Sequence, residues 1–250
     1  MSFRHAGALT LAAGLIASAA AQPSNLAVDK DGRIRTQLSA RNTVTVSSEI
    51  AARISSLPLR EGDAFRAGQQ LVGFDCSLYQ TQLQKAAAAS EGADALVKSD
   101  QRMAELQSIG RFEVEQAQAR LKEARAEESA ARLVVGRCSI NAPFAGHVAK
   151  RHVAAHQYVA SGSPLLDIIE TEQLELQMIV PSKWLTWLKP GVPFTVDVEE
   201  LGKAYPAKVQ RLGARIDPVS QTVAVFGVMD GNRLGLLPGM SGWAVFPGHK

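Results

Sequence analysis

Aromatic residues and cysteines are scarce in this chain, and most of it lacks long hydrophobic runs. Only 6% of its 250 residues are Phe, Trp or Tyr, and only two are cysteines. Beyond residue 21, no segment is long and apolar enough for a membrane-spanning helix, which takes about 20 residues. The formal net charge is +3, and no basic patch is interleaved with aromatic side chains as in base-stacking surfaces. The composition is therefore that of an ordinary soluble protein and argues against nucleic acid as a partner.

Motifs for catalysis are also missing. The chain has no Gly-x-Ser-x-Gly, no His-Glu-x-x-His and no glycine-rich phosphate loop. Ser241 follows Gly239, but its surroundings lack the second glycine of a nucleophile elbow and an evident histidine partner. We therefore expect a protein that is not an enzyme.

Potential metal ligands are present, but their spacing is poor for a site. Three histidines lie close in sequence without sharing a helix face: His147, His152 and His156. Four methionines do not cluster as a soft-metal site would prefer: Met103, Met178, Met229 and Met240. We expect these histidines on the surface or in turns and these methionines in the core, with no metal and no cofactor.

The N-terminus has the pattern of a secretory signal peptide. Arg4 precedes an apolar run at 8–17, and small residues at 19–21 precede Gln22-Pro23. The apolar run is shorter than a membrane-spanning helix requires. We therefore expect a signal peptide at 1–21 with no cysteine for lipid attachment, and an uncleaved anchor remains the alternative.

The central segment, 76–138, carries two sets of heptad-spaced residues. In its second half these are Val114, Ala117, Leu121, Ala124, Glu128, Ala131 and Val135. In its first half they are Tyr79, Leu83, Ala86, Ser90, Ala93, Val97, Asp100 and Ala104. This spacing predicts two helices packed along one seam. Gly110 lies between them and is expected to adopt the left-handed conformation that ends a helix.

The flanks of this segment repeat each other at an offset of 94 residues, without a gap. The aligned pairs are Ile54 with Val148, Leu59 with Val153, Phe65 with Val159, Gly68 with Gly162, and Leu71 with Leu165. Alternating apolar positions broken by glycine predict two copies of one β-hairpin unit, which together form a flattened sandwich. Biotinyl and lipoyl carrier domains share this pattern, but here the helical segment replaces the turn with the modified lysine.

Two further regions complete the organisation. Residues 22–42 are polar and read as an extended lead-in that can add a strand to a later barrel. Beyond the second sandwich half, strands are expected at 174–180, 194–198, 204–213, 222–229 and 241–246, with one short helix at 182–188. We therefore expect sandwich halves at 43–75 and 139–170, the helical hairpin at 76–138 and a β-barrel at 171–250. The fold class is mainly β with one long α-helical hairpin.

The two flanks also carry a specific resemblance. The stretch from Leu59 through Gly62 and Gly68 to Leu71, followed by Ala142-Pro143-Phe144-Ala145-Gly146, resembles the HlyD-type periplasmic adaptor family, also called membrane fusion proteins. Later segments look like the barrel landmarks of that family: Val180-Pro181, Leu188 to Gly191, Asp217 to Thr222, and Leu237 to Met240. The resemblance extends from about residue 42 to residue 246.

The resemblance implies a function and partners. Members of this family bridge an inner-membrane transporter to an outer-membrane channel, so we expect a periplasmic subunit of an efflux or export complex. It would associate with the inner membrane through its partner and form a homo-oligomer. Because the chain stops ten residues after Met240, the further membrane-proximal domain of many adaptors is expected to be absent or rudimentary. An envelope scaffold or binding module without a pump remains the alternative.

The family resemblance predicts one site at the hairpin tip, and the positions of the two cysteines predict a second site at its base. Family members carry a tip signature of Arg, Leu and Ser, which Arg102 and Leu106 match, whereas Glu113 stands where Ser is expected. We expect Arg102, Leu106, Gly110 and Phe112 to form a docking surface. The alternative is that Arg102 is merely solvated and Leu106 packs in the seam. Cys76 and Cys138 flank the hairpin at its base, and export would permit a disulfide between them. Two buried free thiols are the alternative.

Overall fold

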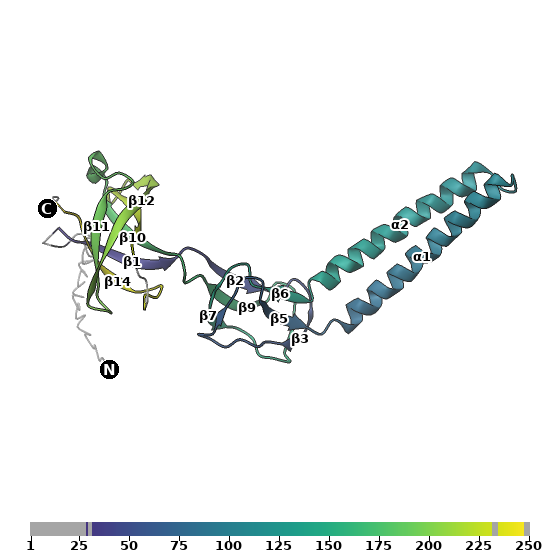
Figure 1. Ribbon diagram of the computed structural model, residues 1–250, viewed down its shortest axis with the longest axis horizontal. Helices are drawn as coiled ribbons and strands as arrows, with labels where there is room; N and C mark the ends of the chain where they lie inside the picture. The colour runs from purple at the N-terminus through teal and green to yellow at the C-terminus, as the bar shows by residue number, and fades with distance from the viewer. Residues whose placement is uncertain (1–28, 30–31, 232–234, 248–250) are drawn as a thin grey trace, which may run out of the picture.

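The computed structural model describes residues 29, 32–231 and 235–247. It has three parts in a row: a closed six-stranded β-barrel, a sandwich of two four-stranded sheets, and a helical hairpin (Figure 1). This arrangement confirms the predicted fold class. The predicted signal peptide lies outside the described residues. Among the residues that are described, neither hairpin helix has the length and hydropathy to cross a bilayer.

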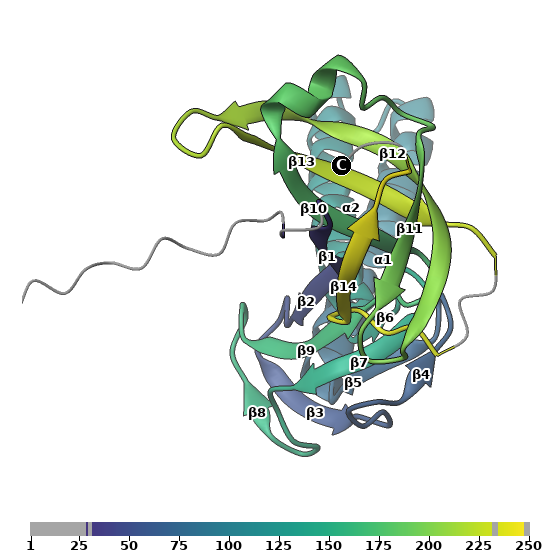
Figure 2. The same cartoon turned by 90° about the vertical axis from the view of Figure 1, so that its left-hand side faces the viewer.

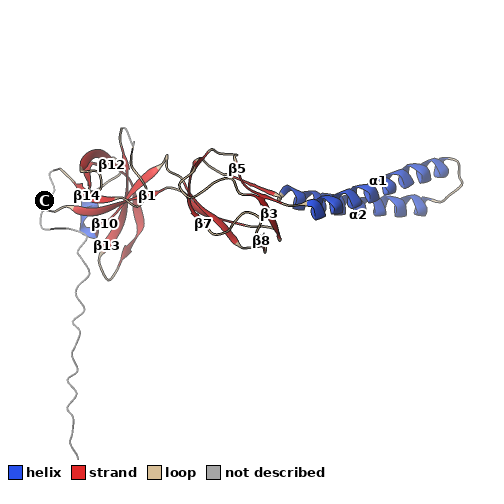
Figure 3. Cartoon of the chain, turned by 90° about the horizontal axis from the view of Figure 1, so that it is seen from below, coloured by secondary structure: helices blue, strands red, loops and turns tan. Residues whose placement is uncertain are grey.

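The hairpin consists of helix α1, Ser77–Glu105, and helix α2, Arg111–Gly136, which lie side by side (Figure 3). Every seam position predicted from the heptads is buried or half-buried. Val97, Ala117 and Leu121 form the centre of the seam. Across the helices, Arg125 donates to the Asp94 carboxylate at 2.7 Å. The periodicity therefore identified the packed side of both helices.

The turn between the helices differs from the expectation for Gly110. The left-handed residue is Gln107, with φ 58°, whereas Gly110 is extended with φ −87° and ψ 170°. Gln107 N–H donates to the Ala104 carbonyl and Ser108 N–H to the Met103 carbonyl, each at 2.9 Å. These two bonds are the Schellman motif that closes a helix C-terminus. Gly110 instead precedes α2 as its N-cap.

The sandwich is built from two symmetric halves that exchange strands. Its strands are β2 Thr43–Ser47, β3 Ala52–Ser56, β4 Ala64–Phe65, β5 Gln70–Phe74, β6 Ser139–Asn141, β7 Gly146–Arg151, β8 Tyr158–Val159 and β9 Pro164–Ile169. One sheet has the order β2-β9-β7-β4 and the other β6-β5-β3-β8. Each sheet thus combines two strands of each half: β2 and β4 of the first half join β7 and β9, and β6 and β8 of the second half join β3 and β5.

The repeat extends to backbone detail. Gly62 and His156, which are 94 residues apart, both have positive φ, at 87° and 68°. Gly62 N–H donates to the Val148 carbonyl at 2.8 Å, and His156 N–H donates to the Ile54 carbonyl at 2.9 Å. His156 is therefore a turn residue in a conformation that usually favours glycine.

The barrel uses one strand from the lead-in and five from the C-terminal region. They are β1 Ile34–Ala40, β10 Leu174–Pro181, β11 Pro193–Val198, β12 Lys203–Asp217, β13 Thr222–Met229 and β14 Ser241–Val245. The expected short helix is the 3₁₀-helix η1, Ser182–Thr186. Figure 2 shows the barrel facing the viewer, with the β12–β13 hairpin extending beyond it. Strand β12 is longer than predicted because it continues to Asp217 in this hairpin.

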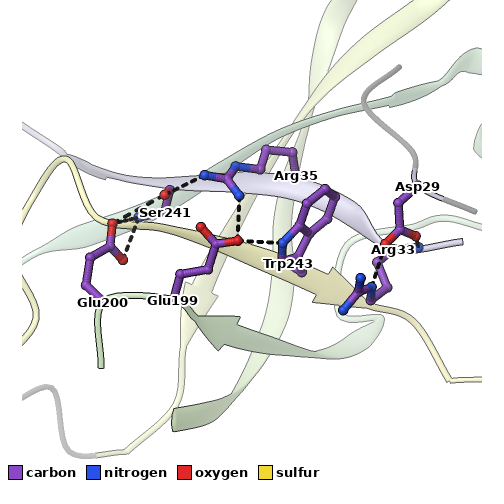
Figure 4. Close-up of polar contacts among 7 residues, drawn as sticks. All are labelled: Asp29, Arg33, Arg35, Glu199, Glu200, Ser241 and Trp243. Carbon is purple, nitrogen blue, oxygen red and sulfur yellow. Dashed lines mark hydrogen bonds and ion pairs between the residues drawn. The ribbon is translucent and has the colours of Figure 1, made fainter. Parts of the chain in front are cut away.

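A polar network on the outer face holds the first and last barrel strands together (Figure 4). The guanidinium carbons of Arg33 and Arg35 lie 5.1 and 5.2 Å from the centroid of the Trp243 ring. Trp243 Nε1 and an Arg35 nitrogen both donate to Glu199 Oε1 at 2.7 Å. The network thus connects β1, β14 and the end of β11, where the barrel closes.

Glu199 makes this closure sensitive to acid. The hydrogen bonds from Arg35 and then from Trp243 hold the pKa of the Glu199 carboxyl below its ordinary value of about 4.5. A carboxylate with a lowered folded-state pKa contributes stability above its unfolded pKa and loses it as pH falls through the folded pKa. We expect wild type to be more stable than Glu199→Gln at pH 7, with the difference shrinking as pH falls below about 4.5 and through the lowered folded-state pKa of Glu199. Urea unfolding at several pH values measures this, and a constant difference down to pH 3 would contradict it.

Candidate functional site: the two ends of the hairpin

The four residues predicted to dock a partner lie together at the hairpin tip. Arg102 is in the last turn of α1, and Leu106 is its C-cap. Gly110 is the N-cap of α2, and Phe112 is in its first turn. The Leu106 side chain is 76% exposed and that of Phe112 is 72% exposed. The tip therefore presents two large apolar side chains to solvent.

Two charged side chains of the tip lie at the helix ends, Arg102 on α1 and Glu113 on α2. Arg102 Nε donates to the Lys98 carbonyl at 3.2 Å, so this side chain folds back along α1. A cation near a helix C-terminus and an anion near an N-terminus are both stabilising. Glu113, which stands where serine was expected, is the acidic residue in the first turn of α2. Leu106 and Phe112 are the large apolar side chains that the tip offers to a partner.

Sequence reasoning missed a groove beside the tip. It is an open groove of about 620 Å³ between the end of α1 and the start of α2. The lining residues are Gln101, Ala104, Glu105, Arg111, Val114, Glu115 and Gln118. Ala104 and Val114 were predicted as seam positions and are only half-buried. The small side chain of Ala104 was the available signal that the seam opens near the turn.

The hairpin base is tied by a disulfide between Cys76 and Cys138, whose Cα atoms are 6.0 Å apart. Cys76 is the N-cap of α1, and Cys138 follows the C-cap of α2. Phe74 N–H donates to the Cys138 carbonyl at 2.9 Å, which continues the pairing of β5 with β6 up to the bond. The long hairpin is thus joined to the sandwich at a covalently closed base.

The candidate metal ligands lie apart from one another. His147 Nδ1 is 2.9 Å from Thr171 Oγ1, His152 Nε2 is 2.8 Å from Asp167 Oδ2, and His156 is in a turn. No group of three or more potential His, Cys, Asp or Glu ligands occurs within 29, 32–231 and 235–247. Met178 and Met229 are in the barrel core, but Met103 is 39% exposed on α1, so its expected core position was wrong.

Comparisons with known proteins agree with this architecture. The family model of the RND MFP barrel-sandwich hybrid domain, where MFP stands for membrane fusion protein, matches residues 42–171, just over half of the chain. The chain is similar to the nodulation protein NolF of Rhizobium meliloti, with 29% identity over 78% of this chain and 57% of NolF. It is also similar to the solvent efflux pump periplasmic linker SrpA of Pseudomonas putida, with 23% identity over 88% of this chain and 61% of SrpA.

Two solved structures share the fold. The membrane fusion protein Spr0693 of Streptococcus pneumoniae aligns with a TM-score of 0.73 at 16% identity, over 86% of this chain and 97% of Spr0693. A MacA-MexA chimera containing the MexA α-hairpin domain of Pseudomonas aeruginosa also aligns with a TM-score of 0.73, at 19% identity. The alignment covers 84% of this chain and 76% of the chimera. By contrast, the chain spans only about three fifths of the length of the curated relatives NolF and SrpA.

Proposed function

Because the chain belongs to the membrane fusion protein family, we propose that it is a non-enzymatic periplasmic adaptor of an efflux or export complex. In this proposal it links an inner-membrane transporter to an outer-membrane channel and is held at the inner membrane by the transporter. The observation that carries the proposal is the projecting hairpin with an exposed apolar tip. Helix α1 has 29 residues, so the tip lies about 44 Å from the sandwich.

The two ends of the molecule suit different contacts. The tip offers Leu106 and Phe112 on a hairpin whose seam and base are both fixed, so a channel would meet a preformed surface. The sandwich and barrel are left for the transporter and for neighbouring copies in a homo-oligomer. A relative named as the periplasmic linker of a solvent efflux pump supports this division. The transported substrate is not specified by any of these contacts.

The tip prediction can be tested by changing its polarity. We expect Arg102→Asp combined with Leu106→Ser to lower export at least tenfold, because the docking surface loses an apolar anchor and its positive charge is replaced by a negative one. Leu133→Ser is the matched control, since Leu133 is 69% exposed on α2 but lies away from the tip. Export is measured in the host strain after deletion of the chromosomal copy. Unchanged export by a folded tip variant would refute docking through these residues.

Crosslinking in intact cells separates the adaptor from a scaffold without a pump. A photo-reactive amino acid at Phe112 should capture an outer-membrane channel protein, and the same probe at Leu133 should not. A short amine-reactive crosslinker should also give oligomers of the adaptor when the transporter is present. If the Phe112 probe captures no membrane protein and only monomers are found, the scaffold alternative is favoured.

A further inference from the structure

The barrel and the sandwich are joined by a narrow waist. Two segments of the described chain cross it: residues 41–42 connect β1 to β2, and residues 170–173 connect β9 to β10 (Figure 1). The apolar core of the barrel and that of the sandwich share no described residue, and the described strands of one part do not pair with those of the other. The angle between the two parts is thus set at the waist.

The two segments of the waist are unequal in length. On the barrel side, Arg41 N–H donates to the Gln173 carbonyl at 3.0 Å, and Arg41 Nη1 donates to Gln173 Oε1 at 2.6 Å. On the sandwich side, Glu170 N–H donates to the Asn42 carbonyl at 2.9 Å. Residues 171–172 lie between these two pairs and have no opposite residue in the shorter segment, where Arg41 and Asn42 are adjacent. Extra residues in one strand interrupt a ladder and bend it, as at a β-bulge.

A buried carboxylate closes the sandwich side of the waist. Glu170, which is 7% exposed, is the one charged side chain among the described residues that is buried. Its Oε2 accepts a hydrogen bond from Asn42 Nδ2 at 2.6 Å, and Asn42 is itself exposed. Burying a carboxylate costs free energy that hydrogen bonds offset only in part. Closing the waist removes water from Glu170 and supplies the bond to Asn42 instead, so the closed and open arrangements differ little in free energy.

The other joint of the molecule, at the hairpin base, is built differently. There a disulfide joins Cys76 to Cys138, and Tyr79 and Val134 of the hairpin pack on the sandwich core. Hairpin and sandwich thus share a covalently closed base and apolar packing, whereas the described residues of sandwich and barrel share neither. A bend of the molecule is consequently expected at the waist. Because the tip lies about 44 Å from the sandwich, a rotation of about 10° at the waist moves it by about 8 Å or more.

We propose that the waist is a latched hinge: the barrel rotates against a rigid unit of sandwich and hairpin, and the hydrogen bond between Asn42 and Glu170 holds the closed angle. His147 Nδ1 lies 2.9 Å from Thr171 Oγ1 and keeps the start of the longer segment on the sandwich, so the rotation takes place at 171–173. A partner bound to the barrel would reorient the distant hairpin tip through this hinge. Under the proposed function that partner is the transporter, but the hinge itself requires neither transporter nor channel.

Distances between pairs of spin labels on the purified chain test the hinge. Thr195→Cys with Ala149→Cys reports the barrel against the sandwich, and Ala149→Cys with Ala119→Cys reports the sandwich against the hairpin. All three positions are exposed, and the native cysteines are occupied by their disulfide. Asn42→Ala should widen the first distance distribution by about twofold or more and leave the second unchanged, because an open waist populates further angles. Asn141→Ala, which removes an exposed asparagine of β6 within the sandwich, is the matched control and should change neither.

A second variant separates the bond from the buried charge. In Glu170→Gln the amide oxygen accepts the same bond from Asn42 without burying a charge, so the first distribution should be no wider than that of wild type. In Asn42→Ala the amide protons of Arg41 and Glu170 should also exchange faster, while circular dichroism is unchanged. The latch is overturned if Asn42→Ala leaves the first distribution as it is or if Glu170→Gln widens it. Widening of the second distribution instead would overturn the placement of the hinge. These results would leave the adaptor function untouched.

Discussion

The Gly146→Ala variant is expected to lose about 3 kcal/mol or more of its free energy of unfolding. An alanine Cβ at this position would lie 2.2 Å from the Ile169 carbonyl oxygen and 3.0 Å from its carbon. Both atoms belong to the backbone of β9, which pairs with β7, so they cannot move aside as a flexible side chain could. The two strands must separate to admit the methyl group. Because β7 and β9 are neighbours in one sheet, this separation weakens the whole sandwich.

The matched control is Gly92→Ala. Gly92 is in the interior of α1, and an added Cβ meets no atom within 4 Å. Alanine favours the helix and restricts the unfolded chain, so this variant should gain about 0.5–1 kcal/mol. Urea unfolding followed by circular dichroism measures both variants against wild type. Equal stabilities for the two variants would show that the close approach of β7 and β9 does not constrain residue 146.

The helical hairpin could be predicted from the sequence because its packing is periodic and local. Each seam position is determined by its spacing from the previous one, and two helices joined by a short turn meet along the sides that share this spacing. The exposed side of α1 that includes Leu96 and Met103 obeys the same spacing, but no partner for it lies among the residues that the structure describes. Periodicity alone therefore identifies a packing side without showing what packs on it.

The sandwich was predicted as two repeated units, but the mixing of strands from both units within each sheet was not. The offset of 94 relates residues of like environment, such as Phe65 and Val159, which are both buried. It does not show which strands pair, because pairing depends on contacts between residues distant in sequence. In the structure Ala64 pairs with His147, and Ala52 pairs with Val159. Each sheet thus contains two strands of each half.

Two local features could not be read from residue type. A glycine next to a helix was assigned the left-handed position, but Gln107 occupies it and Gly110 caps the next helix. The barrel closure joins Arg35, Glu199 and Trp243, which are far apart in sequence and have no shared motif. Such networks form from exposed side chains that the strand register happens to bring together. From the sequence alone, such residues cannot be distinguished from other surface residues, because only the strand register shows that they are neighbours.

The second large effect is expected from breaking the bond at the hairpin base. Cys76→Ser should lower the free energy of unfolding by up to about 4 kcal/mol, because the bond joins residues 62 apart and closing such a loop restricts the unfolded chain. For a chain of this size, that corresponds to a fall in melting temperature of about 10 °C. The base would then be held by β5–β6 pairing and by the Tyr79 hydroxyl, which donates to the Ala51 carbonyl at 3.0 Å. Local exchange of amide protons near residues 74–80 should rise.

The controls for this prediction use the same two sulfur atoms. Cys138→Ser and the double variant should match Cys76→Ser, and wild type measured with reductant should fall to the level of all three. A variant-specific loss that reductant does not reproduce would instead indicate damage to packing around Cys76, which is buried. Mass spectrometry of the exported, non-reduced protein gives the direct test. Finding two thiols that can be alkylated would mean that the hairpin base is not covalently closed in the protein as it functions.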